Sequence, residues 1–199
     1  MATLCLIAAV VCAVTDWIAV AQARRLLEYL AKPAALGFLL LYAALAPHAS
    51  WYLIAALALS LLGDVYLMLP DQLFPAGLAA FLLAHLAYIA AFDATPLARS
   101  IWFIVVAAAS VPLALRVIRA VPDLPLRAAV GVYMGVISLM VASAIASGAL
   151  LATVGALLFF VSDALIALNR FVAPFAWARL GIIVTYHVGQ LLLVLALRT

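Results

Sequence analysis

Long apolar runs, separated by short polar or proline-containing segments, make up most of the chain. Eight of them are candidates for membrane-spanning helices: 2–21, 33–47, 51–69, 76–92, 100–116, 126–147, 149–168 and 178–197. A helix that crosses a bilayer needs about 20 mostly apolar residues, and no segment alternates with the period of two expected of a membrane β-barrel. We therefore predict an all-α fold, a polytopic bundle of eight transmembrane helices that forms a single transmembrane domain over residues 1–199.

Prolines and small residues set the expected ends of these helices. Lys32 and Pro33 are expected to open the second helix, because proline is tolerated in a first turn. The segment 121–125 contains two prolines and separates the fifth helix from the sixth. The weakest boundary is the one at Ser147 and Gly148, and a chain of seven helices is therefore the main alternative.

The first run has some features of a signal peptide, since small residues at 19–23 would suit a cleavage site. No positive charge precedes the run, however, and Asp16 lies within it, so we expect a retained first helix. Cys5 and Cys12 share one face of this helix, and we expect neither a disulfide nor a metal site there.

Composition strengthens the membrane prediction. Hydrophobic residues make up 72% of the chain and charged residues 9%, whereas an ordinary soluble domain is about 45–50% apolar and about 25% charged. A soluble chain of 199 residues could not hide so much apolar surface. The connections are too short for a separate soluble domain, so any chemistry is expected within the bundle or at its ends.

Basic residues are distributed unevenly between the two sides of the predicted bundle. Two of the ten, Arg99 and Arg198, fall on the same side as the termini. The other eight fall on the opposite side: Arg24, Arg25, Lys32, Arg116, Arg119, Arg127, Arg170 and Arg179. Cytoplasmic loops are rich in Lys and Arg, so we expect a multi-pass protein of the cell membrane with both termini outside the cytoplasm. No basic run is interleaved with aromatic residues, so we expect no nucleic-acid partner.

A weak internal similarity suggests two halves of four helices each. Asp64, near the end of the third helix, is followed by His85 in the fourth, and Asp163, near the end of the seventh, is followed by His187 in the eighth. Parallel repeats of this kind are known in membrane proteins. A bundle of two similar four-helix halves is therefore one arrangement to test.

Asp64 and Asp163 differ from most of the seven acidic residues because each lies inside an apolar run. A charge at the centre of a membrane helix costs about 2.5–3.5 kcal/mol, and such residues are often functional. In the predicted topology these two aspartates and Asp16 fall at a similar depth, in the cytoplasmic third of the bundle. For Asp16, near a helix end, a structural role at the membrane interface is the simpler interpretation.

Polar side chains of the fourth and eighth helices are candidates for the same site. His85 and Tyr88 are three residues apart and share a helix face, as do Tyr186 and Gln190, with His187 beside them. We expect a cavity, open toward the cytoplasmic leaflet, in which His85 and Tyr186 meet the two acids. Hydrogen bonding between helices is the alternative role for the histidines, and an ion pair that locks the packing is the alternative for the acids.

Two carboxyl groups held close together in an apolar site share a proton, so that one is protonated and the other ionised near neutral pH. Such a pair supplies a general acid and a general base together. This chemistry suits hydrolysis through an oxocarbenium-like state, or peptide hydrolysis by a pair of aspartates.

The order and spacing of several motifs resemble the YhhN family of membrane proteins, which includes the eukaryotic lysoplasmalogenases. The resemblance covers nearly the whole chain. It rests on Lys32-Pro33, on the segments 62–68, 74–88 and 160–171, and on the run from Tyr186 to Gln190.

This resemblance implies eight membrane helices and hydrolysis of the vinyl ether bond of lysoplasmalogens to a fatty aldehyde and a glycerophospho-base. The aspartates of the family match Asp64 and Asp163, which are therefore expected to be the acid and the base, in either order. The expected partners are a lysophospholipid substrate and membrane lipids, with no cofactor. The expected substrate-binding residues are Lys32, which would meet the lipid phosphate, and Asp16, His85, Tyr88, Tyr186, His187 and Gln190.

Other functions fit parts of the pattern. An intramembrane aspartic protease also uses two membrane aspartates, but Leu61 stands where a Gly-x-Gly-Asp pattern needs glycine. A metal-dependent lipid hydrolase would use His85 and His187 with the acids, but their spacing lacks a metal signature, and we expect no metal. A small-solute transporter or a non-catalytic scaffold is the remaining alternative; interrupted helices would favour transport, and these runs are largely uninterrupted.

Overall fold

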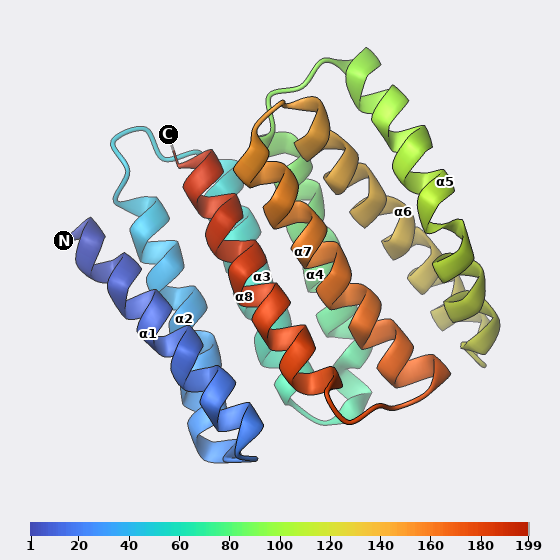
Figure 1. Cartoon of the computed structure of the whole chain (residues 1–199), viewed down its shortest axis with the longest axis horizontal. Coiled ribbons are helices and arrows are strands. Elements are labelled where there is room, and N and C mark those ends of the chain that lie inside the picture. Colours follow the sequence, from blue (N-terminus) through green and yellow to red (C-terminus); the bar gives the residue numbers. More distant parts are fainter. Residues whose placement is uncertain (199) are drawn as a thin grey trace. The chain divides into compact units, whose positions relative to one another are not determined.

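The computed structural model describes residues 1–198, which contain eight helices long and apolar enough to cross a membrane (Figure 1). They are α1 (Ala2–Ala21), α2 (Arg25–Ala44), α3 (Trp51–Met68), α4 (Phe74–Ala91), α5 (Pro96–Ala120), α6 (Leu124–Ala146), α7 (Leu150–Ala167) and α8 (Ala178–Leu197). A 3₁₀ turn, η1 (Asp71–Leu73), precedes α4, and a π-helical turn, η2 (Leu168–Val172), extends α7. The prediction of an all-α bundle with eight spans is confirmed, and the seven-helix alternative is wrong.

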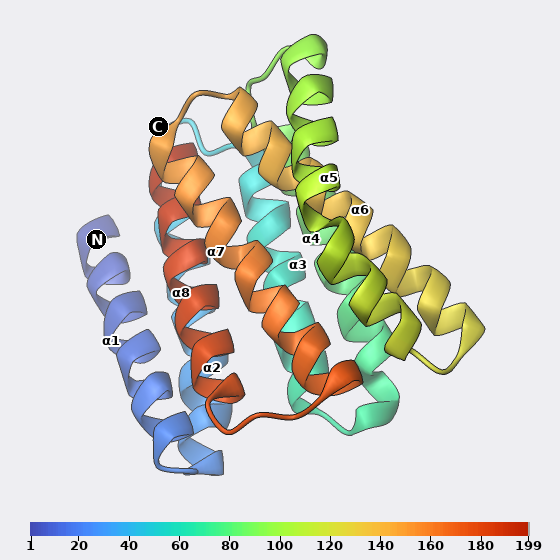
Figure 2. The same ribbon diagram turned by 45° about the vertical axis from the view of Figure 1, so that its right-hand side comes forward.

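The helices fall into two compact units. The first consists of Met1–Ala91 together with the residues from Val194 onward, and the second of Phe92–Leu193. In the first unit α1 pairs with α2, α3 pairs with α4, and α2 packs on α3; in the second, α5 pairs with α6 and α6 packs on α7 (Figures 1 and 2). The units agree with the two four-helix halves expected from the sequence, apart from the last turn of α8. The description of the whole chain as one domain stays a prediction.

The second helix begins earlier than predicted. Pro33 lies inside α2 and does not open it, since the helix starts at Arg25. Proline is tolerated within membrane helices because neighbouring helices and local adjustments satisfy the backbone group that it frees. The correction matters for function, because it places Lys32 inside a helix that packs on α3 and not at a helix end.

The turn between α1 and α2 is built on Ala23, whose φ of 55° lies in the left-handed region. The amide of Ala23 donates to the carbonyl of Val20, and the amide of Arg24 donates to that of Ala19 at 2.8 Å. This pair of bonds is the Schellman pattern, in which the left-handed position is usually glycine. The corresponding turn after α6 does use glycine, Gly148, with a φ of 73°.

Replacing Ala23 by Gly is expected to stabilise the protein. The left-handed conformation costs an L-residue about 1–2 kcal/mol, and the added flexibility of glycine in the unfolded chain offsets about 0.4–1 kcal/mol of that gain. We expect the free energy of unfolding to rise by about 0.5–1 kcal/mol, measured by thermal or denaturant unfolding in detergent. The matched control is Ala13→Gly in the interior of α1, which should lower stability by about 1 kcal/mol; a fall for both variants would contradict the assignment.

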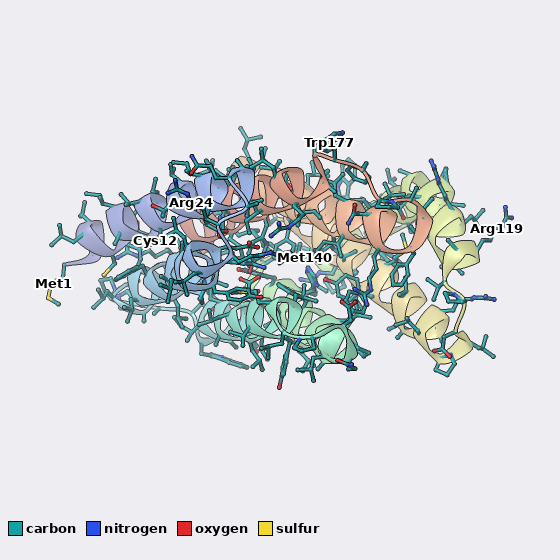
Figure 3. All side chains as sticks on the ribbon, turned by 90° about the horizontal axis from the view of Figure 1, so that it is seen from below. Met1, Cys12, Arg24, Arg119, Met140 and Trp177 are labelled. Atoms are coloured by element: carbon teal, nitrogen blue, oxygen red, sulfur yellow. The ribbon has the colours of Figure 1, made fainter. Side chains whose placement is uncertain are left out.

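The outer surfaces of the helices are apolar. In α5, Val117 is the one buried residue, while Ile104 is 68% exposed. Figure 3 shows carbon-rich side chains projecting outward from the ribbon, and the labelled Trp177, in the turn before α8, is 62% exposed. Isolated exposed apolar residues are common in soluble proteins, but continuous apolar helix surfaces are expected where lipid is the solvent. The chain is a multi-pass membrane protein.

Candidate active site

An ion pair joins α2 to α3 in the first unit. The Lys32 ammonium lies 3.0 Å from Oδ1 of Asp64, and the two side chains are 14% and 2% exposed. Lys32 can reach Asp64 because α2 continues through Pro33 and packs along α3. The aspartate predicted to lie inside the bundle is therefore buried, and its charge is balanced by the lysine that the sequence had assigned to a lipid phosphate.

The neighbour of Asp64 is a glycine that allows α3 and α4 to approach closely. A methyl group on Gly63 would lie 2.7 Å from two ring carbons of Phe81, a separation that real Cβ atoms do not show. Phe81 belongs to the buried face of α4, which also carries His85 and Tyr88, both 0% exposed. The prediction that His85 and Tyr88 share a helix face is confirmed, and that face is fully buried.

Two further polar residues are buried in the first unit. Asp16 of α1 is 0% exposed, so it lies inside the protein and not at an interface with water, where the sequence had suggested a structural role. Ser60 lies one turn before Asp64 in α3 and is also 0% exposed. Its hydroxyl has no hydrogen-bond partner among the residues that the structure describes.

Asp163 has a hydroxyl partner in the second unit. The Tyr133 hydroxyl of α6 donates to Oδ2 of Asp163 in α7 at 2.5 Å. Tyr133 is 7% exposed, whereas Asp163 is only half-buried and so less enclosed than the sequence suggested. Sequence reasoning missed Tyr133, because nothing in its own apolar run distinguishes it; only the packing of α6 on α7 brings the two side chains together.

The other predicted residues of the second unit lie on α8, which packs closely on α7. Methyl groups on Gly155 and Gly189 would each lie 2.9 Å from the carbonyl oxygen of the other glycine, so both positions need glycine. The Ser162 hydroxyl donates to the carbonyl of Ile182 at 3.0 Å, which ties the same two helices together. This close contact with α7 fixes the orientation of α8 and so of the face that carries the predicted side chains.

On that face, Tyr186, His187 and Gln190 are buried, with exposed fractions of 4%, 6% and 0%. Tyr186 meets the ring of Phe159 edge-on, with 5.3 Å between the ring centroids, and lies 5.5 Å from the His187 ring. These contacts fix the orientation of Tyr186. The structure thus places predicted polar residues in two buried groups, one in each unit, and the meeting of Asp64 with Asp163 stays a prediction.

Within residues 1–198, no three or more His, Cys, Asp or Glu side chains are grouped so that they could hold a metal ion. The polar groups that are present can instead exchange protons: two carboxyl groups, one paired with an ammonium and the other with a phenol, and two buried imidazoles. Groups of this kind supply general acids and bases.

These observations define a class of protein: a polytopic helical membrane protein whose membrane helices carry acid–base groups. Residues 27–197 match the YhhN family, and the chain belongs to that family. The resemblance inferred from the sequence motifs is confirmed.

Several relatives are named lysoplasmalogenases. Lysoplasmalogenase TMEM86B of Sus scrofa is 38% identical over 141 residues, which cover 71% of this chain and 61% of the relative. Lysoplasmalogenase TMEM86A of Homo sapiens is 36% identical over 174 residues, which cover 81% of this chain and 69% of the relative. The chain therefore spans about three fifths of the length of the first of these relatives. No solved structure matches the chain.

Proposed function

We propose that this protein is a membrane-embedded hydrolase that cleaves the vinyl ether bond of lysoplasmalogens and releases a fatty aldehyde and a glycerophospho-base. The observation that carries the proposal is that Asp64 and Asp163 contact different kinds of group, a cation for Asp64 and a neutral hydroxyl for Asp163. Relatives named lysoplasmalogenase support the substrate class.

Asp64 is proposed as the general base. A cation at 3.0 Å favours the charged form of a carboxyl group, so Lys32 keeps Asp64 ionised in surroundings that would otherwise disfavour the charge. An ionised carboxylate stabilises a developing carbocation and accepts a proton from water. Lys32 then serves the reaction through Asp64; its contact with a lipid phosphate stays a prediction.

Asp163 is proposed as the general acid. A protonated carboxyl group still has a carbonyl oxygen that accepts a hydrogen bond, so the bond from Tyr133 to Oδ2 is compatible with a proton on the group. The hydroxyl orients the carboxyl and, because it carries no charge, favours the ionised form less strongly than the ammonium beside Asp64 does. The environment of Asp64 therefore favours the ionised form more than that of Asp163 does. Acid–base catalysis by two carboxyl groups requires such a difference.

The reaction balances with these two groups. Asp163 gives its proton to the carbon of the vinyl ether, R–CH=CH–O–R′, and an oxocarbenium ion, R–CH₂–CH=O⁺–R′, forms. Water adds to this ion and gives its proton to Asp64, which leaves a hemiacetal. Protonated Asp64 then returns the proton to the departing oxygen while ionised Asp163 takes the hydroxyl proton, so that an aldehyde and an alcohol leave and both acids are restored.

The surroundings proposed for this reaction follow from the distribution of charge. Seven of the ten Lys and Arg residues lie in or beside the connections after α1, α5 and α7, and the bias of such residues toward the cytoplasm supports an orientation with both termini outside it. A single-chain lysolipid would enter from the bilayer with its tail between helices and its headgroup in water. His85, Tyr88, Tyr186, His187, Gln190 and Asp16 are proposed to line its path.

The test is aldehyde release by the purified full chain in lipid nanodiscs. Lysoplasmenyl-ethanolamine should yield a fatty aldehyde and glycerophosphoethanolamine, while the matched lysolipid with a saturated alkyl ether should be stable, because it has no double bond to protonate. Chelator-resistant activity would separate this mechanism from a metal-dependent hydrolase. Release of a fatty acid, or transport of a solute into proteoliposomes without lipid cleavage, would refute the proposal.

Replacing Tyr133 by Phe should slow aldehyde release by about 10- to 100-fold, since the hydroxyl stabilises Asp163 once it has given up its proton, and a hydrogen bond to a charged group contributes about 1.5–3 kcal/mol. The carboxyl group of Asp163 remains, so activity should fall without being abolished. The rate per folded molecule is the measurement, with Tyr66→Phe in the first unit as the control. An unchanged rate for Tyr133→Phe would remove Tyr133 from the site.

A further inference from the structure

Ser60 differs from the other buried serines of the described chain. Ser138 and Ser143 each donate to the carbonyl four residues earlier in α6 at 2.7 Å, and Ser162 donates to the carbonyl of Ile182. Such bonds are the usual way in which a helix satisfies a buried hydroxyl. Ser60 is 0% exposed and has no partner of this kind among residues 1–198.

A buried hydroxyl without a partner costs free energy, and the exceptions in native proteins usually have a functional reason. The position of Ser60 supplies such a functional reason. It lies four residues before Asp64 on the buried face of α3, so the two side chains are neighbours on one helix face. Their Cβ atoms are expected to be about 5–6 Å apart, a separation at which one water molecule can form O–H···O bonds of about 2.7–2.8 Å with both side-chain oxygens.

We infer that the Ser60 hydroxyl holds the attacking water against the Asp64 carboxylate and is a positioning residue for the proposed hydrolysis. The inference rests on the proposed function. A buried water needs about two to four polar partners, and Ser60 and Asp64 supply two of them from one helix. When the water adds to the oxocarbenium carbon, its O–H bond breaks and the proton passes to Asp64, while the serine hydroxyl keeps its own proton.

This role predicts a change in the choice of nucleophile as well as in rate. An oxocarbenium ion reacts with methanol as it does with water, and the product is a mixed acetal, R–CH₂–CH(OCH₃)–O–R′, heavier than the substrate by one methanol. In the native protein the positioned water should outcompete methanol added at a low fraction of the solvent. Without the serine hydroxyl the water is no longer held, and methanol can compete on nearly equal terms.

The experiment compares the full chain with Ser60→Ala and Ser60→Cys in nanodiscs containing the vinyl ether lysolipid and dilute methanol. Both variants should lower kcat about 10- to 100-fold with little change in KM, and both should raise the ratio of mixed acetal to aldehyde at least fivefold. The control is Ser143→Ala, whose serine bonds to a helix carbonyl in α6; its rate and product ratio should match the native protein.

The outcomes separate the two claims. A native protein that releases no aldehyde refutes the proposed function. An active native protein whose Ser60 variants keep its product ratio overturns the inference about Ser60, even where the rate falls, because loss of folded protein changes the rate and not the ratio. The use of two variants keeps the test decisive where one of them fails to fold.

Discussion

Replacement of Asp64 by Asn is expected to lower the rate of aldehyde release by about 100- to 10,000-fold, which is the range that a general acid or base contributes. Asparagine has nearly the same shape as aspartate but cannot take a proton from water. It also leaves the ammonium of Lys32 facing an uncharged amide where it had a carboxylate at 3.0 Å. The rate per folded molecule in nanodiscs is the quantity to measure.

The loss of the ion pair is a second effect of Asp64→Asn that has to be separated from catalysis. Removing one partner of a buried pair destabilises a protein by about 3–5 kcal/mol, and the partial exposure of Lys32 lowers that figure. The double variant Lys32→Met/Asp64→Asn should recover part of the stability and none of the activity. The control is Asp71→Asn in η1, an exposed acid of the same unit. A double variant with native activity would leave Asp64 with a packing role alone.

Replacement of Asp163 by Asn is expected to lower the rate by a similar factor, about 100- to 10,000-fold, with a smaller loss of stability. The amide oxygen of asparagine can still accept the Tyr133 hydroxyl, so the contact between α6 and α7 should persist. Asparagine has no proton to give to the vinyl ether carbon. Asp93→Asn, an exposed acid at the start of the same unit, is the matched control and should leave the rate unchanged.

The combination of the two substitutions tests whether the aspartates act together. Residues that act as a unit in one reaction lose far less on joint replacement than the product of their separate losses. We expect Asp64→Asn/Asp163→Asn to be no more than about tenfold slower than the worse single variant. Fully multiplicative losses would indicate that the two carboxyl groups contribute independently.

The helices were predictable because few backbone conformations are stable in lipid. Backbone groups in a membrane must bond within the segment, so an apolar run of sufficient length becomes a helix. The error at α2 has a local cause. Arg25 to Ala31 are too polar to extend an apolar run, yet they continue the helix through Pro33 and bring Lys32 against α3.

The sequence alone could identify only those site residues whose side chains are unusual for their own segment. An aspartate in an apolar run is recognisable because placing a charged side chain in the membrane costs free energy, and Asp64 and Asp163 were found in that way. Tyr133 and Ser60 belong to residue types that are common in membrane helices, and their significance depends on what lies next to them. The pairing of Lys32 with Asp64 and of Tyr133 with Asp163 joins different helices, and no spacing along the chain encodes those contacts.

The most direct test of proton transfer to carbon is hydrolysis of the vinyl ether lysolipid by the native protein in D₂O, with immediate trapping of the aldehyde and mass analysis. The mechanism predicts one deuterium on the carbon next to the aldehyde group, whereas the same aldehyde, added ready-made and treated alike, should remain unlabelled. An aldehyde released without deuterium, or a lysolipid left intact under conditions in which the protein is folded, would contradict the account.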